Sequence, residues 1–154
     1  MKVRPMILRF SSGSATPAYA EETRIPSFGN GPVKVRIYTD YFCPPCRSME
    51  QELEPIVIDL VRRRIAAVTF VDTPVHRETI LYAKCFLGMV TGRRDVSQIL
   101  WARAALFKAA EKNIRSLPDL EALLGERGLK CRYVDSSRAF ETFRKHLRDD
   151  RIDS

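Results

Sequence analysis

The feature that most constrains the fold is a strand-like segment that runs through a CPPC motif into a helix-like segment. Residues 33–39 (VKVRIYT) alternate apolar and charged side chains and are rich in β-branched residues, which predicts a β-strand. From Pro44 to about Arg64, apolar residues recur at helical spacing and predict an amphipathic helix, which Pro55 should bend. Residues 66–71 (AAVTFV) are typical of a short buried strand in a parallel sheet. Together these segments predict a βαβ unit with a right-handed crossover.

The chain beyond this unit is predicted to be mainly helical. With 154 residues, 45% of them hydrophobic, the sequence is long enough to build one globular domain. That domain is expected to cover residues 25–154, with the βαβ unit in 25–76 and the added helices in 77–150. The helical segments run from Glu78 to Val90, from Asp95 to Lys112, from Leu117 to Leu124 and from about Ser136 to Arg148, and Asp95 and Ser116 are the expected caps of the second and third.

Residues 1–24 are interpreted as a flexible tail or a degenerate export signal, because they lack sustained periodicity. A small-residue cleavage pattern ends at Ala20, but a polar run at 11–14 (SSGS) interrupts the apolar part of the signal. A working signal before Ala20 would place the chain in the periplasm or another extracytoplasmic compartment, and otherwise a cytoplasmic location is expected. No transmembrane segment is expected, since no stretch reaches the apolar length that a membrane helix needs.

The net charge of +7 does not by itself indicate a nucleic-acid partner. The basic run at 144–151 is interleaved with acidic residues, which is typical of a solvated helix face. The sequence shows no basic stripe interleaved with aromatic residues, so nucleic-acid binding is not expected.

The CPPC motif falls at the carboxyl end of the first predicted strand, where reactive groups gather in open α/β sheets. Cys43 should begin the helix, where unpaired backbone N–H groups favour a thiolate, and Cys46 should lie one turn deeper on the same face. This spacing predicts thiol–disulfide exchange, with Cys43 as the nucleophile and Cys46 as the resolving thiol, and it requires no cofactor.

A structural zinc site is the main alternative for a CxxC motif, and the sequence argues against it. A zinc knuckle uses backbone N–H groups between its cysteines, and Pro44 and Pro45 have none to donate. Proline suits the first turn of a helix, where those donors are unpaired in any case. Cys85 and Cys131 are not at zinc-ligand spacing from each other or from a histidine, so no metal is expected.

The segments 31–46 (GPVKVRIYTDYFCPPC) and 70–76 (FVDTPVH), followed by a helical insertion, resemble the DsbA-type branch of the thioredoxin superfamily. The resemblance covers the chain from about Ile25 to its end. It implies an α/β thioredoxin fold with a helical insertion, exchange with protein thiols or disulfides, and a redox partner protein. It also gives Cys43 and Cys46 the family's nucleophile and resolving roles.

The sequence departs from this family in two places. Pro45 stands where the family usually has a histidine, which is expected to make the pair a weaker oxidant. The sequence given stops at Ser154, before the family's final strand–strand–helix segment with its cis-proline, and Pro74 is no substitute. It is interpreted either as a fragment of a longer protein or as a natural truncation. A truncated fold would leave strand 33–39 with an open edge, so a homo-oligomer through that strand is expected. The alternative function is a catalytically weak binding or remnant domain.

Two aromatic residues and an acid lie beside the motif. Tyr41 and Phe42 either form an apolar collar for a protein substrate around Cys43 or pack beneath the loop, and both interpretations stay open. Asp40 is expected to be exposed rather than to accept a proton from Cys46.

Five residues elsewhere in the chain also carry expectations. Trp101 is expected to fill the interface between the insertion and the sheet. Cys85 is interpreted as an inert buried thiol, and a disulfide with Cys131 is the alternative that the sequence leaves open. His76 is expected to be a cap or surface residue, and His146 to be solvated.

Overall fold

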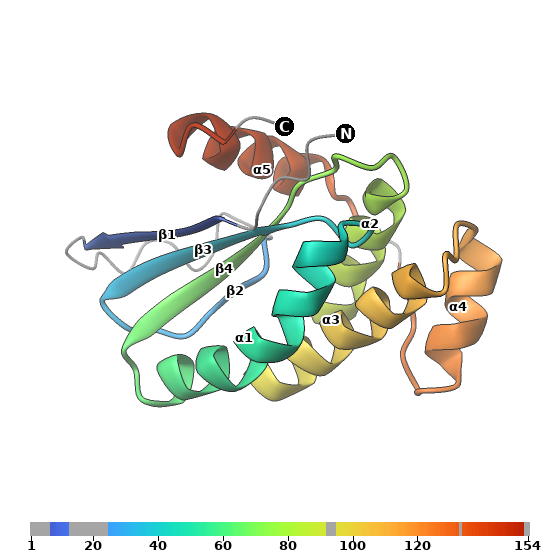
Figure 1. Cartoon of the computed structure of the whole chain (residues 1–154), viewed down its shortest axis with the longest axis horizontal. Coiled ribbons are helices and arrows are strands. Elements are labelled where there is room, and N and C mark those ends of the chain that lie inside the picture. The colour runs from blue at the N-terminus through green and yellow to red at the C-terminus, as the bar shows by residue number, and fades with distance from the viewer. Residues whose placement is uncertain (1–6, 13–24, 92–94, 133, 153–154) are drawn as a thin grey trace.

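The structure is a computed structural model that describes residues 7–12, 25–91, 95–132 and 134–152, with the backbone alone for 7–12. Within these ranges the chain forms a mixed α/β fold with one four-stranded sheet and five helices (Figure 1). The strands lie in the order β1-β3-β4-β2. Their bounds are β1 (Ile7–Ser12), β2 (Ser27–Phe28), β3 (Val33–Thr39) and β4 (Ala66–Asp72).

The predicted βαβ unit is confirmed at the level of its elements. β3 and β4 pair in parallel, with Val33 opposite Ala66 and Thr39 opposite Asp72. α1 (Pro44–Arg62) connects them and contains Pro55. Figure 1 shows that α1 changes direction near its middle, as expected for a helix in which proline removes one backbone hydrogen bond.

The remaining helices agree with the predicted segments to within one or two residues at their ends. The Asp95 side chain accepts a hydrogen bond from the Ser97 backbone at 2.9 Å, and Ser116 accepts one from the Asp119 backbone at 3.3 Å, so both predicted caps are confirmed. The bounds are α2 (Thr79–Val90), α3 (Val96–Glu111), α4 (Leu117–Gly125) and α5 (Ser137–Asp149).

The predicted tail is wrong for residues 7–12, which form β1. The pattern missed this strand because it is short and its apolar start has the composition of a signal segment. The other residues of the predicted tail, including the cleavage pattern that ends at Ala20, lie outside the described residues.

The predicted open edge along residues 33–39 is also wrong. β1 pairs with β3 in antiparallel fashion from Ile7 opposite Tyr38 to Ser12 opposite Val33. β3 therefore has a neighbour on both sides. The expected homo-oligomer through this strand loses its physical basis, because the backbone groups along that edge are already paired.

The sheet separates two apolar clusters, and Figure 1 shows α5 on the opposite side of the sheet from α1 and α3. Val35 and Ile37 of β3 pack in the larger cluster, which also contains residues of α1 to α4. Tyr38 and Val71 face the other way. There they meet the apolar side of α5, made of Ala139, Phe143 and Leu147.

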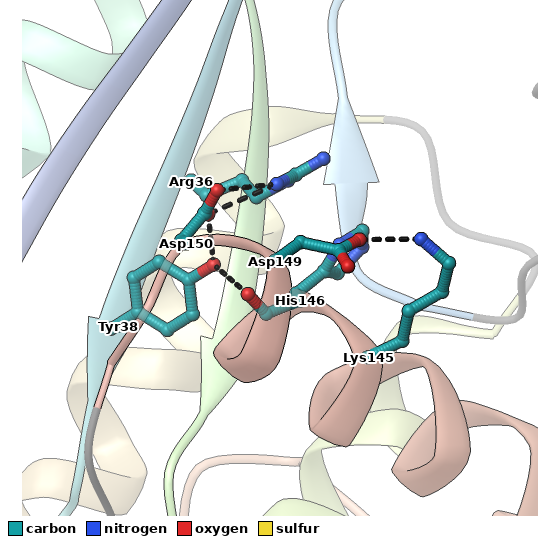
Figure 2. A network of polar contacts seen from close by, with 6 residues as sticks. All are labelled: Arg36, Tyr38, Lys145, His146, Asp149 and Asp150. Carbon is teal, nitrogen blue, oxygen red and sulfur yellow. Dashed lines mark hydrogen bonds and ion pairs between the residues drawn. The ribbon is translucent and has the colours of Figure 1, made fainter.

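Polar contacts attach the end of α5 to β3 (Figure 2). Arg36 Nη1 donates to both carboxylate oxygens of Asp150, at 3.0 and 2.9 Å. The Tyr38 hydroxyl also donates to Asp150 and lies 3.2 Å from the His146 carbonyl. Burial and the Asp150 carboxylate raise the pKa of Tyr38.

The prediction that His146 is solvated is wrong: its side chain is partly buried, and burial lowers its pKa. In the last turn of α5, Lys145 pairs with Asp149 on the surface.

A disulfide joins Cys85 of α2 to Cys131, which precedes α5, with the two Cα atoms 4.6 Å apart. The interpretation of Cys85 as an inert thiol is therefore wrong. The chain beside this disulfide lies directly on α2. A Cβ added to Gly88 would come within 2.0 Å of the Arg132 carbonyl oxygen, so only glycine fits this position.

The expectation for Trp101 is wrong as well. Its side chain is 45% exposed, while the neighbouring Leu100 is buried. The apolar face of α3 that packs in the core is formed instead by residues such as Ile99 and Leu106.

Candidate functional site

The two motif cysteines occupy the positions that the helix start gives them. Cys43 is the N-cap of α1, with extended backbone angles (φ −82°, ψ 115°), and Pro44 and Pro45 take the first two helical positions. Prolines are tolerated there because the first N–H groups of a helix have no partner within it. Both cysteines carry thiols, not a disulfide, in this structure.

The two thiols differ in exposure. Cys43 is partly exposed, whereas Cys46 is only 4% exposed. Burial raises the pKa of Cys46 to about 12, and the neighbouring Cys43 and the Asp40 carboxylate add to this effect. A hydrogen bond with the Asp40 backbone opposes it. A partner that approaches from solvent therefore meets Cys43 first.

Asp40 holds the loop that leads from β3 to the motif. Its carboxylate accepts hydrogen bonds from the Phe42 and His76 backbone N–H groups, both at 2.8 Å, and lies 3.1 Å from His76 Nδ1. Its own carbonyl accepts from the Cys43 N–H at 3.2 Å. Asp40 is only 3% exposed, so its predicted exposure is wrong. His76 is likewise tied to the motif loop and is not an isolated surface residue.

The two aromatic residues before Cys43 have different environments. Tyr41 is fully buried, its ring centre lies 4.8 Å from that of Phe107, and its hydroxyl donates to Asp72 at 3.3 Å. Tyr41 therefore packs beneath the loop and cannot form a collar. Phe42 is partly exposed and packs edge-on against Tyr82, so it alone of the pair remains available to a substrate.

A buried charged cluster lies beneath the motif, and the sequence analysis missed it. The Arg103 guanidinium of α3 is fully buried and reaches Glu50 of α1, with 2.6 Å between Arg103 Nε and Glu50 Oε1. This is a close charge contact in a direction poor for a hydrogen bond. Arg103 Nη1 lies 3.5 Å from Asp72 Oδ1, and Nη2 donates to the Thr39 hydroxyl.

Burial changes the ionisation of this cluster. It raises the pKa of Asp72 to about 6, against the effect of the nearby Arg103, and it raises the pKa of Glu50 in the same way. Burial opposes the charged form of Arg103 too, but attraction to Glu50 and Asp72 outweighs it and raises the pKa of the guanidinium. The arginine thus stays charged in the core.

The sequence carried a usable signal for this cluster. Glu50 interrupts the apolar stripe that Cys46, Leu53 and Val57 form along α1. Arg103 interrupts the apolar positions of α3 in the same manner. Two opposite charges on two core-facing helical stripes predict a buried ion pair between the helices, since buried charges are almost always paired.

No group of three or more His, Cys, Asp or Glu side chains in the described part of the chain could hold a metal ion. In the same residues, no helix is long and apolar enough to cross a membrane. Comparison of the chain with protein-family models, with curated proteins and with solved structures gave no match.

Proposed function

We propose that this chain is a thiol–disulfide oxidoreductase that exchanges disulfides with protein substrates through Cys43 and Cys46. One observation carries the proposal. Two thiols lie within one turn at the start of α1, and one is partly exposed while the other is buried with a pKa of about 12. This asymmetry suits an attacking thiol and a resolving thiol.

In the reducing direction, the Cys43 thiolate attacks one sulfur of a substrate disulfide. The substrate S–S bond breaks, a mixed disulfide forms on Cys43, and the first substrate sulfur leaves as a thiolate that takes up a proton. Cys46 then loses its proton and attacks the Cys43 sulfur, which releases the second substrate sulfur as a thiol. The substrate gains two electrons, and the pair ends as a Cys43–Cys46 disulfide that a dithiol partner reduces again.

The architecture supports a DsbA-type thioredoxin fold as part of this proposal. The motif lies at the start of α1, which connects the parallel strands β3 and β4. Helices α2 to α4 follow β4, where the helical insertion of that fold is expected. The antiparallel β1 occupies the side of β3 on which the family has its cis-proline strand. The backbone on both sides of β3 is therefore paired in this chain.

A protein-disulfide reduction assay with a dithiol as electron donor tests the proposal. The wild type should turn over, Cys43→Ser should be inactive, and Cys46→Ser should turn over much more slowly, because without the resolving thiol only the donor dithiol can cleave the mixed disulfide on Cys43. The Cys85→Ala/Cys131→Ala variant serves as the matched control and should retain turnover where it is folded. An inactive wild type would favour the alternative of a binding or remnant domain, and activity in Cys43→Ser would contradict the assignment.

A further inference from the structure

We propose that Arg103 is a positioning residue through which α3 sets the thiol–disulfide equilibrium of Cys43 and Cys46. This inference rests on the proposed function, because it assigns a role to a residue outside the motif. Arg103 belongs to the helical segment after β4, not to the βαβ unit that carries the cysteines.

The first argument is geometric. The guanidinium contacts three segments that adjoin the motif: Glu50 in α1, Thr39 at the end of β3 and Asp72 at the end of β4. Asp72 in turn accepts the hydroxyl of Tyr41, which lies in the loop before Cys43. A single side chain therefore ties the loop and the helix start to one another from the core side.

The contact between Arg103 and Glu50 lies close to the resolving thiol, Cys46, along α1. Glu50 follows Cys46 by four residues on the buried face of α1, so the two side chains lie one turn apart. The plane of the guanidinium is itself fixed by aromatic rings, with its carbon 4.3 Å from the centre of the Phe70 ring and 5.2 Å from that of Phe107. A movement of α3 would therefore be transmitted to the first two turns of α1.

The second argument is electrostatic. The disulfide carries no charge, whereas the reduced form can ionise, so at a pH where a thiolate is populated a nearby cation stabilises the reduced form and a carboxylate destabilises it. Arg103 approaches the core side of α1 with a positive charge, Glu50 on that side of α1 carries a negative one, and Glu50 Oε2 has no hydrogen-bond partner among the described residues. Removing the Arg103 charge and removing the Glu50 charge should therefore shift the thiol–disulfide equilibrium in opposite directions. A unit charge on the order of 10 Å away changes such an equilibrium by about tenfold at an effective dielectric constant of about 20.

The test measures the fraction of Cys43–Cys46 disulfide in buffers of reduced and oxidised glutathione at mildly alkaline pH, by alkylation and mass spectrometry. Arg103→Met should favour the disulfide by about tenfold, a reduction potential lower by about 30 mV for a two-electron couple. Arg103→Lys should shift the equilibrium less, because lysine keeps the positive charge but not the planar arrangement of several N–H donors that the guanidinium has.

Glu50→Gln should favour the dithiol by a similar factor. The matched control is Arg36→Met, which also breaks an ion pair between a helix and the sheet, but on the α5 side, away from the motif. It should leave the equilibrium unchanged even where it lowers the melting temperature.

Each outcome decides between the claims. Equal shifts in Arg103→Met and Arg36→Met, or none in either Arg103 variant, would overturn the role of Arg103 while leaving the exchange reaction intact. If Arg103→Met does not fold, Glu50→Gln decides: a shift toward the dithiol supports the cluster's influence, and an unchanged or opposite value overturns it. A wild type that forms no Cys43–Cys46 disulfide at any glutathione ratio would instead sink the proposed function.

Discussion

Removing the Cys85–Cys131 disulfide should lower the free energy of unfolding by about 4 kcal/mol. The two cysteines are 46 residues apart in the sequence. In the chain-entropy model, a cross-link that closes a loop of this size removes about 13 cal/mol/K of entropy from the unfolded chain, which corresponds to about 4 kcal/mol at room temperature. Segment 129–132 should also lose its fixed position on α2, because the cross-link holds Cys131 beside the helix.

The measurement is denaturant unfolding of the Cys85→Ala/Cys131→Ala variant, followed by circular dichroism. The matched control is Cys43→Ala, which removes a thiol without removing a cross-link and should change the unfolding free energy by less than about 1 kcal/mol. A double variant that loses less than about 1 kcal/mol would refute the reasoning, because it would mean that the bond does not constrain the unfolded chain.

In the reduced protein, iodoacetamide should label Cys43 before Cys46, because Cys46 is buried and its pKa is raised to about 12; peptide mass mapping gives the order, and simultaneous labelling would contradict it. Gly88→Ala should lower the melting temperature by several degrees or more, since its Cβ would lie 2.0 Å from the Arg132 carbonyl oxygen; an unchanged transition in calorimetry would show that this close approach is absent. Burial raises the pKa of Asp72 from 3.8 to about 6, so the folded protein binds this proton more tightly than the unfolded chain does. The wild type should therefore lose about 3 kcal/mol of stability at this site as the pH rises through that window. Asp72→Asn should flatten the dependence, and equal slopes in denaturation series at several pH values would argue against the buried carboxyl.

Local patterns in the sequence were sufficient to predict most of the secondary structure. The alternation in 33–39 and the buried run at 66–71 gave both parallel strands, because side-chain periodicity depends only on neighbouring residues. The caps at Asp95 and Ser116 were predicted for the same reason, since a cap bonds to a backbone group two or three residues away.

Features that depend on long-range contacts were not predicted. β1 becomes a strand by pairing with β3, which lies more than twenty residues further along the chain, and its own sequence is too short to show a period. The disulfide required knowledge of the Cα distance between Cys85 and Cys131, which no spacing rule supplies. The apolar character of Trp101 alone predicted that it fills the interface between the insertion and the sheet, although large apolar residues are often exposed.

The sequence was sufficient to predict the positions of the two motif cysteines, but not the buried residues that surround them. The positions of Cys43 and Cys46 on α1 follow from the strand–helix boundary, which the sequence shows directly. The burial of Asp40 depends on the loop that carries His76, thirty-six residues later. The role of Arg103 depends on how α3 packs against the sheet, so its functional interest appears only in three dimensions.

The most direct test of the central claim is the capture of mixed disulfides on Cys43. Reduced Cys46→Ser protein is mixed with a disulfide-containing protein, quenched with acid and mapped by mass spectrometry, with Cys43→Ser as the matched control. The account predicts a covalent adduct between Cys43 and a substrate cysteine in Cys46→Ser, and none in Cys43→Ser. Equal capture by both variants, or an adduct at any residue other than Cys43, would contradict the assignment of Cys43 as the attacking thiol.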